Sequence, residues 1–298
     1  MTFSHLLEEV NQGHRVRKSL YQSIEKKLGK NKRVIAFFTS FIFPVMLQDQ
    51  DADMLEEILH NSRMANDSEL VLLLNSPGGE ALPAERIVNI CRSFSNSRFS
   101  VIVPKMAKSA ATMICLGACK IGMSKTSELG PIDPQIPVED NQGQVTKYLS
   151  AHEIIESYTD LFSKANKTKG NLEPFLQQLA RFDARDIRRI VSAQELSESI
   201  AITCLQNSVF PGLTSQKIKA KIGPFLNPKY TKVHGRPIYY DLARKCGLDI
   251  ELHELNSPIW QLVWQLYVRL NHVVSNHNIH IGKIIESSED SYTAPFAT

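Results

Sequence analysis

Cysteine is scarce in this chain of 298 residues, and its spacing does not suit a metal site or a disulfide framework. The five cysteines are odd in number and include no CxxC pair. Cys115 and Cys119 are four residues apart, but no His or Cys lies nearby to complete a set of metal ligands. We therefore expect reduced thiols packed in a core, no metal and no cofactor.

Long hydrophobic runs are also missing. The most hydrophobic segment, 34–47, has fourteen residues and contains Pro44, so it is too short to span a bilayer. A mostly polar segment of about thirty residues precedes it, which is unlike a signal peptide. The sequence therefore predicts a cytoplasmic protein without a membrane span.

Charge is nearly balanced, with 34 Lys and Arg against 31 Asp and Glu and a net charge of +3. This charge is too small and too evenly spread to indicate a nucleic-acid partner. A run of Lys and Arg between residues 164 and 189 is interrupted by acidic residues, and we interpret it as a solvated helical face. The chain also lacks a phosphate-binding loop, so any dependence on ATP would come from a partner protein.

What is present is an alternation of strand and helix patterns. Residues 34–38 and 70–74 have the pattern of buried strands, and residues 51–61 between them have that of a helix. A helix over 81–94 and a third strand over 100–103 follow. Strands joined by helices form parallel sheets, so we expect an α/β fold with a parallel sheet core and flanking helices. We also expect a short strand near 120–123, a mostly helical layer over 146–209, and helices over 239–246 and 259–275.

A Ser-Pro-Gly-Gly turn containing Gly78 and Gly79 ends the strand over 70–74 and leads into a helix. Such a turn places unpaired backbone N–H groups at the carboxyl edge of a parallel sheet, where ligands of open α/β folds bind. Glycines allow these amides to approach a substrate oxygen closely. A plain strand-to-helix turn uses the same residues, so the motif alone leaves a structural interpretation open.

Ser109 occupies the equivalent place after the next strand, at the start of a helix of small residues. The N-terminus of a helix offers free N–H donors and the positive end of a dipole to a developing oxyanion. The N–H of Ala110 would be one donor, and that of Gly78 or Gly79 the other. From the local sequence alone, a helix N-cap is the simpler interpretation of Ser109.

Three sequence blocks resemble a known family. They are residues 73–79 (Leu-Leu-Asn-Ser-Pro-Gly-Gly), 107–112 (Ala-Lys-Ser-Ala-Ala-Thr) and 127–135 (Ser-Glu-Leu-Gly-Pro-Ile-Asp-Pro-Gln). A fainter fourth block begins at His234 and leads into residues 243–248. In this order and spacing, the blocks resemble the serine dehydrogenase proteinase family, which is related to signal peptide peptidase A and to the proteolytic subunit of Clp protease. The resemblance spans roughly residues 33–250.

The resemblance implies a ClpP/crotonase-like fold and a serine peptidase that forms an acyl-enzyme on Ser109, with an oxyanion hole from Gly78, Gly79 and Ala110. It also implies peptide or protein substrates and a homo-oligomer. Two other functions stay open. One is an acyl-CoA-processing enzyme of the same fold, which would use the glycine amides for a thioester oxyanion, and the other is a catalytically inactive scaffold.

The resemblance leaves the general base open. Clp-type enzymes place a histidine where this chain has Asp133-Pro134-Gln135, whereas signal peptide peptidase A uses a lysine further along. Lys147 lies 38 residues after Ser109, follows a loop and stands at the expected start of a helical stretch, so we select it as the general base. Its amine could accept the serine proton only if desolvation or a neighbouring cation lowered its pKa.

Other side chains compete for this role or for an accessory one. Lys164 and Lys167 lie further along the chain, and Lys108 would have to fold back from its place beside the serine. His152 lies on the helix predicted after the loop. His234 is a candidate accessory residue that orients the base or binds substrate, with a purely structural loop residue as the alternative.

We divide the chain into three parts. We expect an amphipathic helix over residues 1–30, bent at Gly13, and the ClpP/crotonase-like peptidase domain over residues 31–250. Residues 251–298 are expected to form a C-terminal helix and a polar tail. The first helix and an aromatic stripe from Trp260 to Tyr267 are the expected subunit contacts.

Overall fold

A central sheet organises the protein. The computed structural model describes residues 13–29, 31–62, 64, 68–139, 144–227, 230 and 235–296. Within these residues the sheet has seven strands in the order β11-β10-β1-β2-β3-β5-β9. Its parallel part comprises β1 (Lys32–Thr39), β2 (Glu69–Asn75), β3 (Phe99–Val103), β5 (Lys120–Met123) and β9 (Ile250–Leu252). The predicted parallel α/β core is confirmed.

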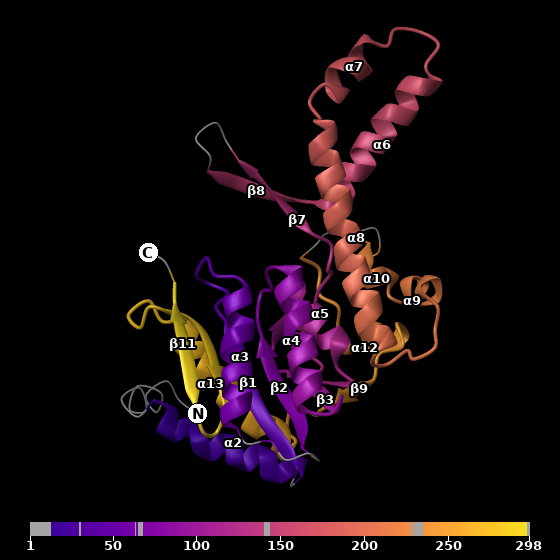
Figure 1. Cartoon of the computed structure of the whole chain (residues 1–298). Coiled ribbons are helices and arrows are strands. Elements are labelled where there is room, and N and C mark those ends of the chain that lie inside the picture. The colour runs from indigo at the N-terminus through magenta and orange to yellow at the C-terminus, as the bar shows by residue number, and fades with distance from the viewer. Residues whose placement is uncertain are drawn as a thin grey trace.

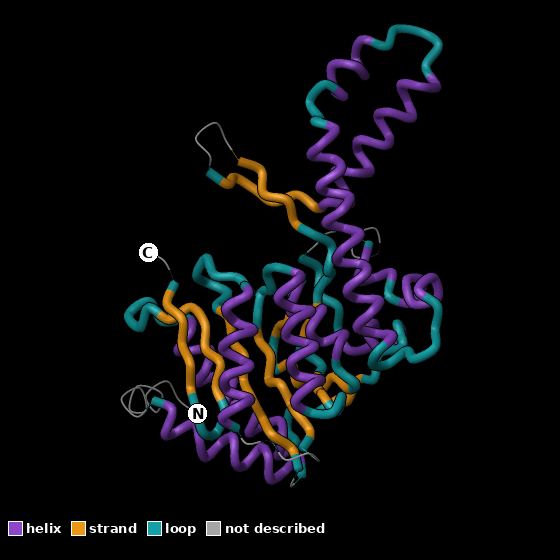
Figure 2. Tube along the Cα trace, viewed as in Figure 1, coloured by secondary structure: helices purple, strands orange, loops and turns teal. Residues whose placement is uncertain are grey.

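Helices cover both faces of this sheet (Figure 1 and Figure 2). Helices α3 (Asp49–Asn61), α4 (Ala81–Phe94) and α5 (Ala110–Gly117) lie on one face, and α2 (His14–Leu28) and α13 (Pro258–Val274) lie on the other. Successive side chains of a strand point to opposite faces, so Phe37 packs with the first group and Phe38 with the second. Because both faces are buried, the strands are continuous hydrophobic runs in the sequence.

The C-terminal segment differs from the predicted polar tail. Strands β10 (Ile281–Glu286) and β11 (Ser291–Pro295) form an antiparallel hairpin, and β10 pairs with β1 so that Ile284 lies opposite Phe38. The side chain of Glu286 is fully buried. These strands depend on pairing with an edge strand that is distant in sequence, which no local pattern reveals.

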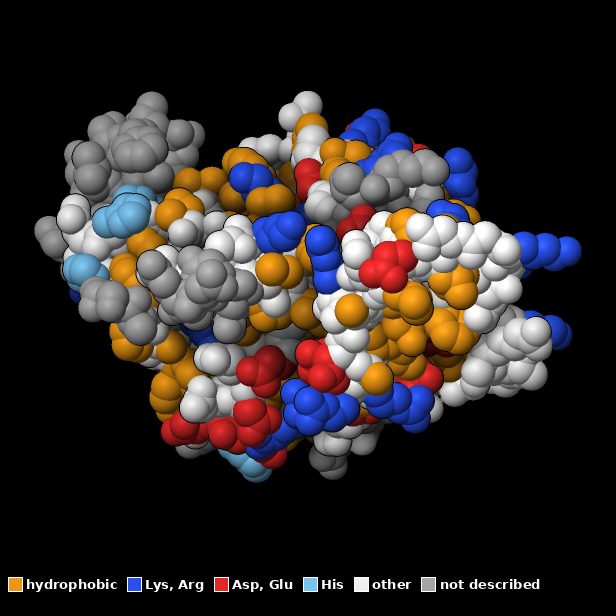
Figure 3. Space-filling view, turned by 90° about the horizontal axis from the view of Figure 1, so that it is seen from above, with side chains coloured by type: hydrophobic (Ala, Val, Ile, Leu, Met, Phe, Trp, Pro, Cys, Tyr) orange, Lys and Arg blue, Asp and Glu red, His pale blue; other side chains and the backbone are white. Residues whose placement is uncertain are grey.

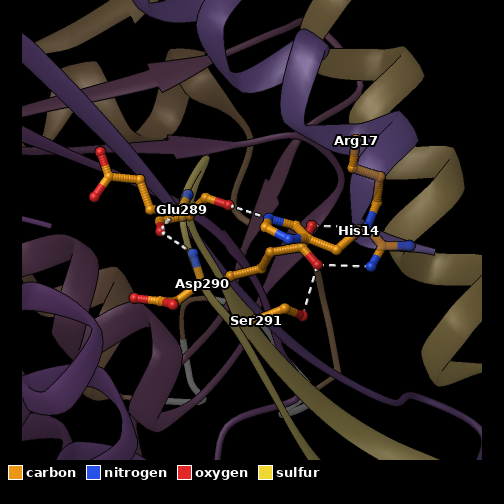
Figure 4. A network of polar contacts seen from close by, with 7 residues as sticks. His14, Arg17, Glu289, Asp290 and Ser291 are labelled. Carbon is orange, nitrogen blue, oxygen red and sulfur yellow. Dashed lines mark hydrogen bonds and ion pairs between the residues drawn. The ribbon is translucent and has the colours of Figure 1, made fainter. Parts of the chain in front are cut away.

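A buried ion pair attaches this hairpin to helix α2 (Figure 4). Nε and Nη2 of Arg17 donate to the two carboxylate oxygens of Glu286 at 2.7 and 2.6 Å, and Ser291 Oγ donates to the same group at 2.7 Å. Nε2 of His14 lies 2.8 Å from the carbonyl oxygen of Ser287. Burial by itself lowers the pKa of Arg17, but the hydrogen bond to Glu286 and its charge outweigh burial, so the pKa is raised. The guanidinium therefore stays charged inside the protein.

A hairpin and a helical arm project from the carboxyl-end side of the parallel strands (Figure 1). The hairpin consists of β7 (Gln135–Glu139) and β8 (Val145–Ser150). The arm consists of α6 (Ala151–Lys167), α7 (Glu173–Leu179) and the outer half of α8 (Ala184–Gln206), whose inner half packs against α4 and α5. The prediction that a helical layer begins at residue 146 is wrong, because residues 145–150 pair with β7 as a strand.

Shorter elements complete the chain. They are β4 (Met106–Ala107), β6 (Glu128–Leu129), α9 (Ser215–Lys221), α10 (Gly223–Leu226) and α12 (Tyr240–Lys245). The predicted first helix is observed as α2 from His14 onward, while residues 1–12 lie outside the described part. None of the described helices is both long enough and apolar enough to cross a membrane.

Candidate active site

Two turns meet at the carboxyl ends of neighbouring parallel strands. The first follows β2 and contains Ser76 and the two glycines, and the second follows β3 and contains Ser109. They are joined by backbone hydrogen bonds, from Ser76 N to Met106 O and from Lys108 N to Ser76 O, each 3.0 Å long. The structure therefore brings the two motifs together, as their positions at adjacent strand ends predict.

Gly78 is packed directly against the Ser109 turn. Its φ of +96° is a left-handed conformation that favours glycine. A Cβ at this position would lie 2.4 Å from Lys108 O and 2.9 Å from both Ala110 N and the Cβ of Ser109. Gly79 is equally confined, because its Cβ would lie 2.4 Å from the backbone N of Leu47. Both glycines are therefore required by close backbone contact.

Ser109 does not act as an ordinary helix cap. It precedes α5 in the N-cap position, but its side chain makes no capping hydrogen bond. Its backbone has φ 49° and ψ −122°, a sparsely populated conformation for a residue with a side chain. Such a conformation costs about 1–3 kcal/mol and occurs preferentially at functional sites. The surrounding hydrogen bonds hold the serine in this geometry.

The backbone N–H groups around Ser109 differ in their availability. The N–H of Gly78 donates to Ser76 Oγ at 3.1 Å, so this amide is already engaged. Among the residues that the structure describes, no acceptor is hydrogen-bonded to the N–H of Gly79 or of Ala110. The Ala110 amide also lies at the positive end of the α5 dipole. Two of the three predicted donors thus have no acceptor among the described residues.

A groove of about 870 Å³ opens beside Ser109. It lies between the two turns, helix α8 and the β7–β8 hairpin, and its lining is mainly apolar. The larger apolar side chains that line it include Met46, Leu82, Met113, Ile132, Tyr148 and Leu196. The described lining residues include no Lys, Arg or His. The described part of its walls thus supplies a mainly apolar surface without a cationic or imidazole group.

Lys108 is committed to a structural contact. Its Nζ donates to Glu128 Oε2 at 2.7 Å and to the carbonyl oxygen of Leu129 at 3.2 Å. Because Nζ donates to two acceptors on β6, this nitrogen is not free to accept a proton from the adjacent serine. Lys108 instead ties the Ser109 turn to β6.

The structure does not bring Lys147 together with Ser109. Lys147 lies on β8 opposite Val138, its side chain is exposed, and helix α6 begins only at Ala151. The neighbouring Tyr148, paired with Pro137, lines the groove. Since successive side chains of a strand alternate, Lys147 lies on the hairpin face that points away from the groove. Its expected position at a helix start is therefore wrong.

The remaining candidate bases do not line the groove or lie outside the described residues. Lys164 and Lys167 lie in the last turn of α6, on the projecting arm. Nε2 of His152, in the first turn of α6, is 3.7 Å from a carboxylate oxygen of Glu156. His234 lies outside the described residues. Groups of His, Cys, Asp or Glu that could hold a metal are not found among the described side chains.

Three buried polar side chains were missed by sequence reasoning. Asn75 Oδ1 accepts from Met106 N at 3.1 Å, and Ser76 Oγ accepts from the Gly78 amide. Thr112 Oγ1 donates to Ala107 O at 2.8 Å and accepts from Gly130 N at 3.0 Å. All three lie in the blocks that carried the family resemblance, which is the signal that could have identified them.

The comparison with protein families decides which family the chain belongs to. The model of the ClpP-like SDH-type serine proteinase family matches residues 15–209, well over half of the chain. The chain belongs to the SDH-type serine proteinase family. The family expectation is confirmed, and the two turns described above lie inside the matched region.

Curated relatives of this SDH-type proteinase occur in Methanocaldococcus jannaschii. The uncharacterized protein MJ0137 is 40% identical over 204 residues, which cover 66% of this chain and 58% of the relative. The uncharacterized protein MJ1495 is 31% identical over 131 residues, which cover 42% of this chain and 44% of the relative. The chain thus spans about half the length of the curated relatives it matches.

Solved structures similar to this SDH-type proteinase include two mutants of the 1510-N membrane-bound stomatin-specific protease. The mutant in complex with a substrate peptide has a TM-score of 0.33 and is 14% identical in sequence. The match covers 80% of the present chain and 96% of the mutant's chain. The second mutant has a TM-score of 0.32 and 12% identity, over 96% and 75% of the two chains.

Proposed function

We propose that this SDH-type proteinase hydrolyses peptide bonds through an acyl-enzyme on Ser109. The observation that carries the proposal is the combination of a strained serine without a capping bond and two unbonded amides, those of Gly79 and Ala110, in adjoining turns. Membership of a serine proteinase family supports the same chemistry. An ordinary helix cap would leave the serine hydroxyl engaged.

The proposed reaction begins with attack of Ser109 Oγ on the carbonyl carbon of the scissile bond. The carbonyl π electrons move to the oxygen, which accepts hydrogen bonds from the N–H groups of Gly79 and Ala110. The intermediate collapses, the C–N bond breaks, and the amine leaves with a proton delivered by the general acid. A water molecule then attacks the ester carbonyl carbon and gives a proton to the general base. The bond from this carbon to Ser109 Oγ breaks, Oγ regains the proton, and the second product leaves as a carboxylic acid. Loss of one oxyanion donor typically lowers the rate by about 10²–10³.

We retain Lys147 as the proposed general base. In its neutral form, the Lys147 amine would take the proton from Ser109 Oγ and later deliver it to the leaving amine. Because Lys147 lies on the outer face of the β7–β8 hairpin, this role requires the hairpin to turn toward the groove. The rate of serine labelling as a function of pH in Lys147→Ala tests the assignment. A rate and pH profile equal to those of the wild type would remove Lys147 from this role.

A fluorophosphonate probe, which reacts with activated serines, tests the nucleophile. We expect the wild type to be labelled once per chain and Ser109→Ala to remain unlabelled. Ser197→Ala is a matched control, because Ser197 lines the same groove but lies within helix α8. Labelling of Ser109→Ala at the wild-type level would contradict the proposal. Binding of coenzyme A without probe labelling would instead support the acyl-CoA alternative.

The proposed substrates are peptides or proteins with apolar segments that fit the groove. The homo-oligomer and the cytoplasmic location stay predictions from the sequence.

A further inference from the structure

The arm is attached to the protein at one end only. In α6, only Ala151 is buried, α7 has no buried residue, and the buried residues of α8 begin at Ile190. The outer parts of the three helices pack on one another, with the ring of Tyr158 5.7 Å from that of Phe182. We call residues 162–182 the arm tip. The side chains of the arm tip are thus not needed to fill the core of the sheet domain.

The arm tip exposes large apolar side chains. Phe162 is 51% exposed, Leu172 is 40% exposed and Leu176 is 54% exposed. Seen from above, hydrophobic side chains gather on the right of the molecule, over the arm, with both basic and acidic side chains at their edges (Figure 3). Scattered exposed apolar residues need no explanation, but a cluster at the end of a projecting arm marks an interaction surface.

The same tip concentrates positive charge. Lys164, Lys167, Lys169 and Arg181 lie in it, and Glu173 is its one acidic residue, which gives a net charge of +3 over residues 162–182. None of these four cations forms an ion pair with any residue that the structure describes. The tip therefore carries as much net charge as the whole chain. Its cations are available to an anionic partner.

Exposed aliphatic and aromatic side chains beside unpaired cations are the features of a segment that lies in a membrane interface. Lysines are depleted from the cores of protein–protein interfaces, and nucleic-acid sites use stacking aromatics in place of exposed leucines. Anionic lipids attract each Lys or Arg near their surface, and the acyl boundary accepts the apolar side chains. We propose that the arm tip docks on a membrane surface rich in anionic phospholipids, with Phe162, Leu172 and Leu176 inserted between the headgroups.

Docking would also orient the groove. The arm stands on the same side of the sheet as the groove beside Ser109, and α8 extends about 34 Å from end to end. The groove would then lie on the side of the sheet that faces the membrane. Docking does not rest on the proposed peptidase activity, since the tip residues are separate from Ser109.

Co-sedimentation of the full chain with vesicles tests this proposal. The vesicles contain phosphatidylcholine alone or phosphatidylcholine with a quarter of phosphatidylglycerol, at low and high salt. We expect binding to the anionic vesicles that high salt weakens, and little binding to the neutral ones. Replacing Lys164, Lys167 and Lys169 with Gln should weaken binding roughly a hundredfold, because each lysine contributes about 1 kcal/mol near an anionic surface. Phe162→Ser with Leu176→Ser should weaken it by about tenfold or more.

Matched controls remove the same groups elsewhere. The exposed lysines Lys18, Lys26 and Lys27 lie on α2, so their replacement with Gln removes the same charge without touching the arm. Leu255→Ser removes a side chain that is 42% exposed in a loop. Near-ultraviolet circular dichroism confirms that each variant is folded. Equal binding of wild type and tip variants, or equal binding to neutral vesicles, would overturn the proposal. So would a concentration-dependent dimer that the tip variants abolish without any vesicle binding.

Discussion

Replacing Gly78 with alanine tests whether the two turns act as one unit. The left-handed φ of +96° costs a residue with a side chain about 1–2 kcal/mol. The added Cβ would lie 2.4 Å from Lys108 O, and overpacking of this kind costs about 1–3 kcal/mol. Together these effects should lower the free energy of unfolding by about 2–5 kcal/mol, measured by urea denaturation. Gly170→Ala is the matched control, because its Cβ would meet no atom within 4 Å.

The same substitution should disable the serine. Relief of the contact requires the backbone on either side of Ser109 to move relative to the Gly79 amide. Misplacing one oxyanion donor lowers the reaction rate by about 10²–10³. The assay is the second-order rate constant of fluorophosphonate labelling, measured at a temperature where near-ultraviolet circular dichroism shows the variant to be folded. Folded Gly78→Ala that labels at the wild-type rate would refute the coupling of the two turns.

Three further predictions concern buried groups. Glu286→Gln leaves the buried guanidinium of Arg17 without its counter-ion. The free energy of unfolding, measured by urea denaturation, should therefore fall by about 3–5 kcal/mol. An unchanged urea midpoint would contradict this prediction. Burial lowers the pKa of His253, and the nearby carboxylate of Glu251 opposes this effect only in part. The unfolded chain therefore binds the proton more tightly, and this contribution to stability is present above about pH 6.5 and lost as pH falls through the folded pKa. His253→Gln should flatten that pH dependence of the urea midpoint, and an equal slope in both proteins would exclude His253 as its source. The structure describes all five cysteines, and only Cys119 is exposed. A thiol reagent should therefore modify one site per chain in the native protein and all five sites after unfolding. Modification of more than one site in the native protein would contradict the observed burial.

The sequence alone predicted the parts of the site that are local. The strands β2 and β3 are buried on both faces and are therefore unbroken hydrophobic runs, and each is followed by a recognisable turn. Parallel strands that are neighbours in the sheet bring their carboxyl ends to one edge. The meeting of Gly78 with Ser109 followed from those two facts.

The position of Lys147 could not be predicted in this way. Residues 145–150 adopt a strand because they pair with β7, and a bulge between Val138 and Glu139 changes which side chains face the groove. A shift of one residue in a strand exchanges its two faces, so the direction of Lys147 depends on register. The helical periodicity of the residues after the loop gave no information on this register.

Two further features were decided only by the tertiary structure. The sequence determined that glycine and serine lie at adjacent strand ends, but hydrogen bonding in the folded chain decided that the amides of Gly79 and Ala110 stay free while that of Gly78 is engaged. The C-terminal hairpin likewise forms because β10 pairs with β1 and because Glu286 meets Arg17 from the other end of the chain. Propensities and turns act between near neighbours in sequence, whereas pairing, register and the satisfaction of buried polar groups depend on distant segments.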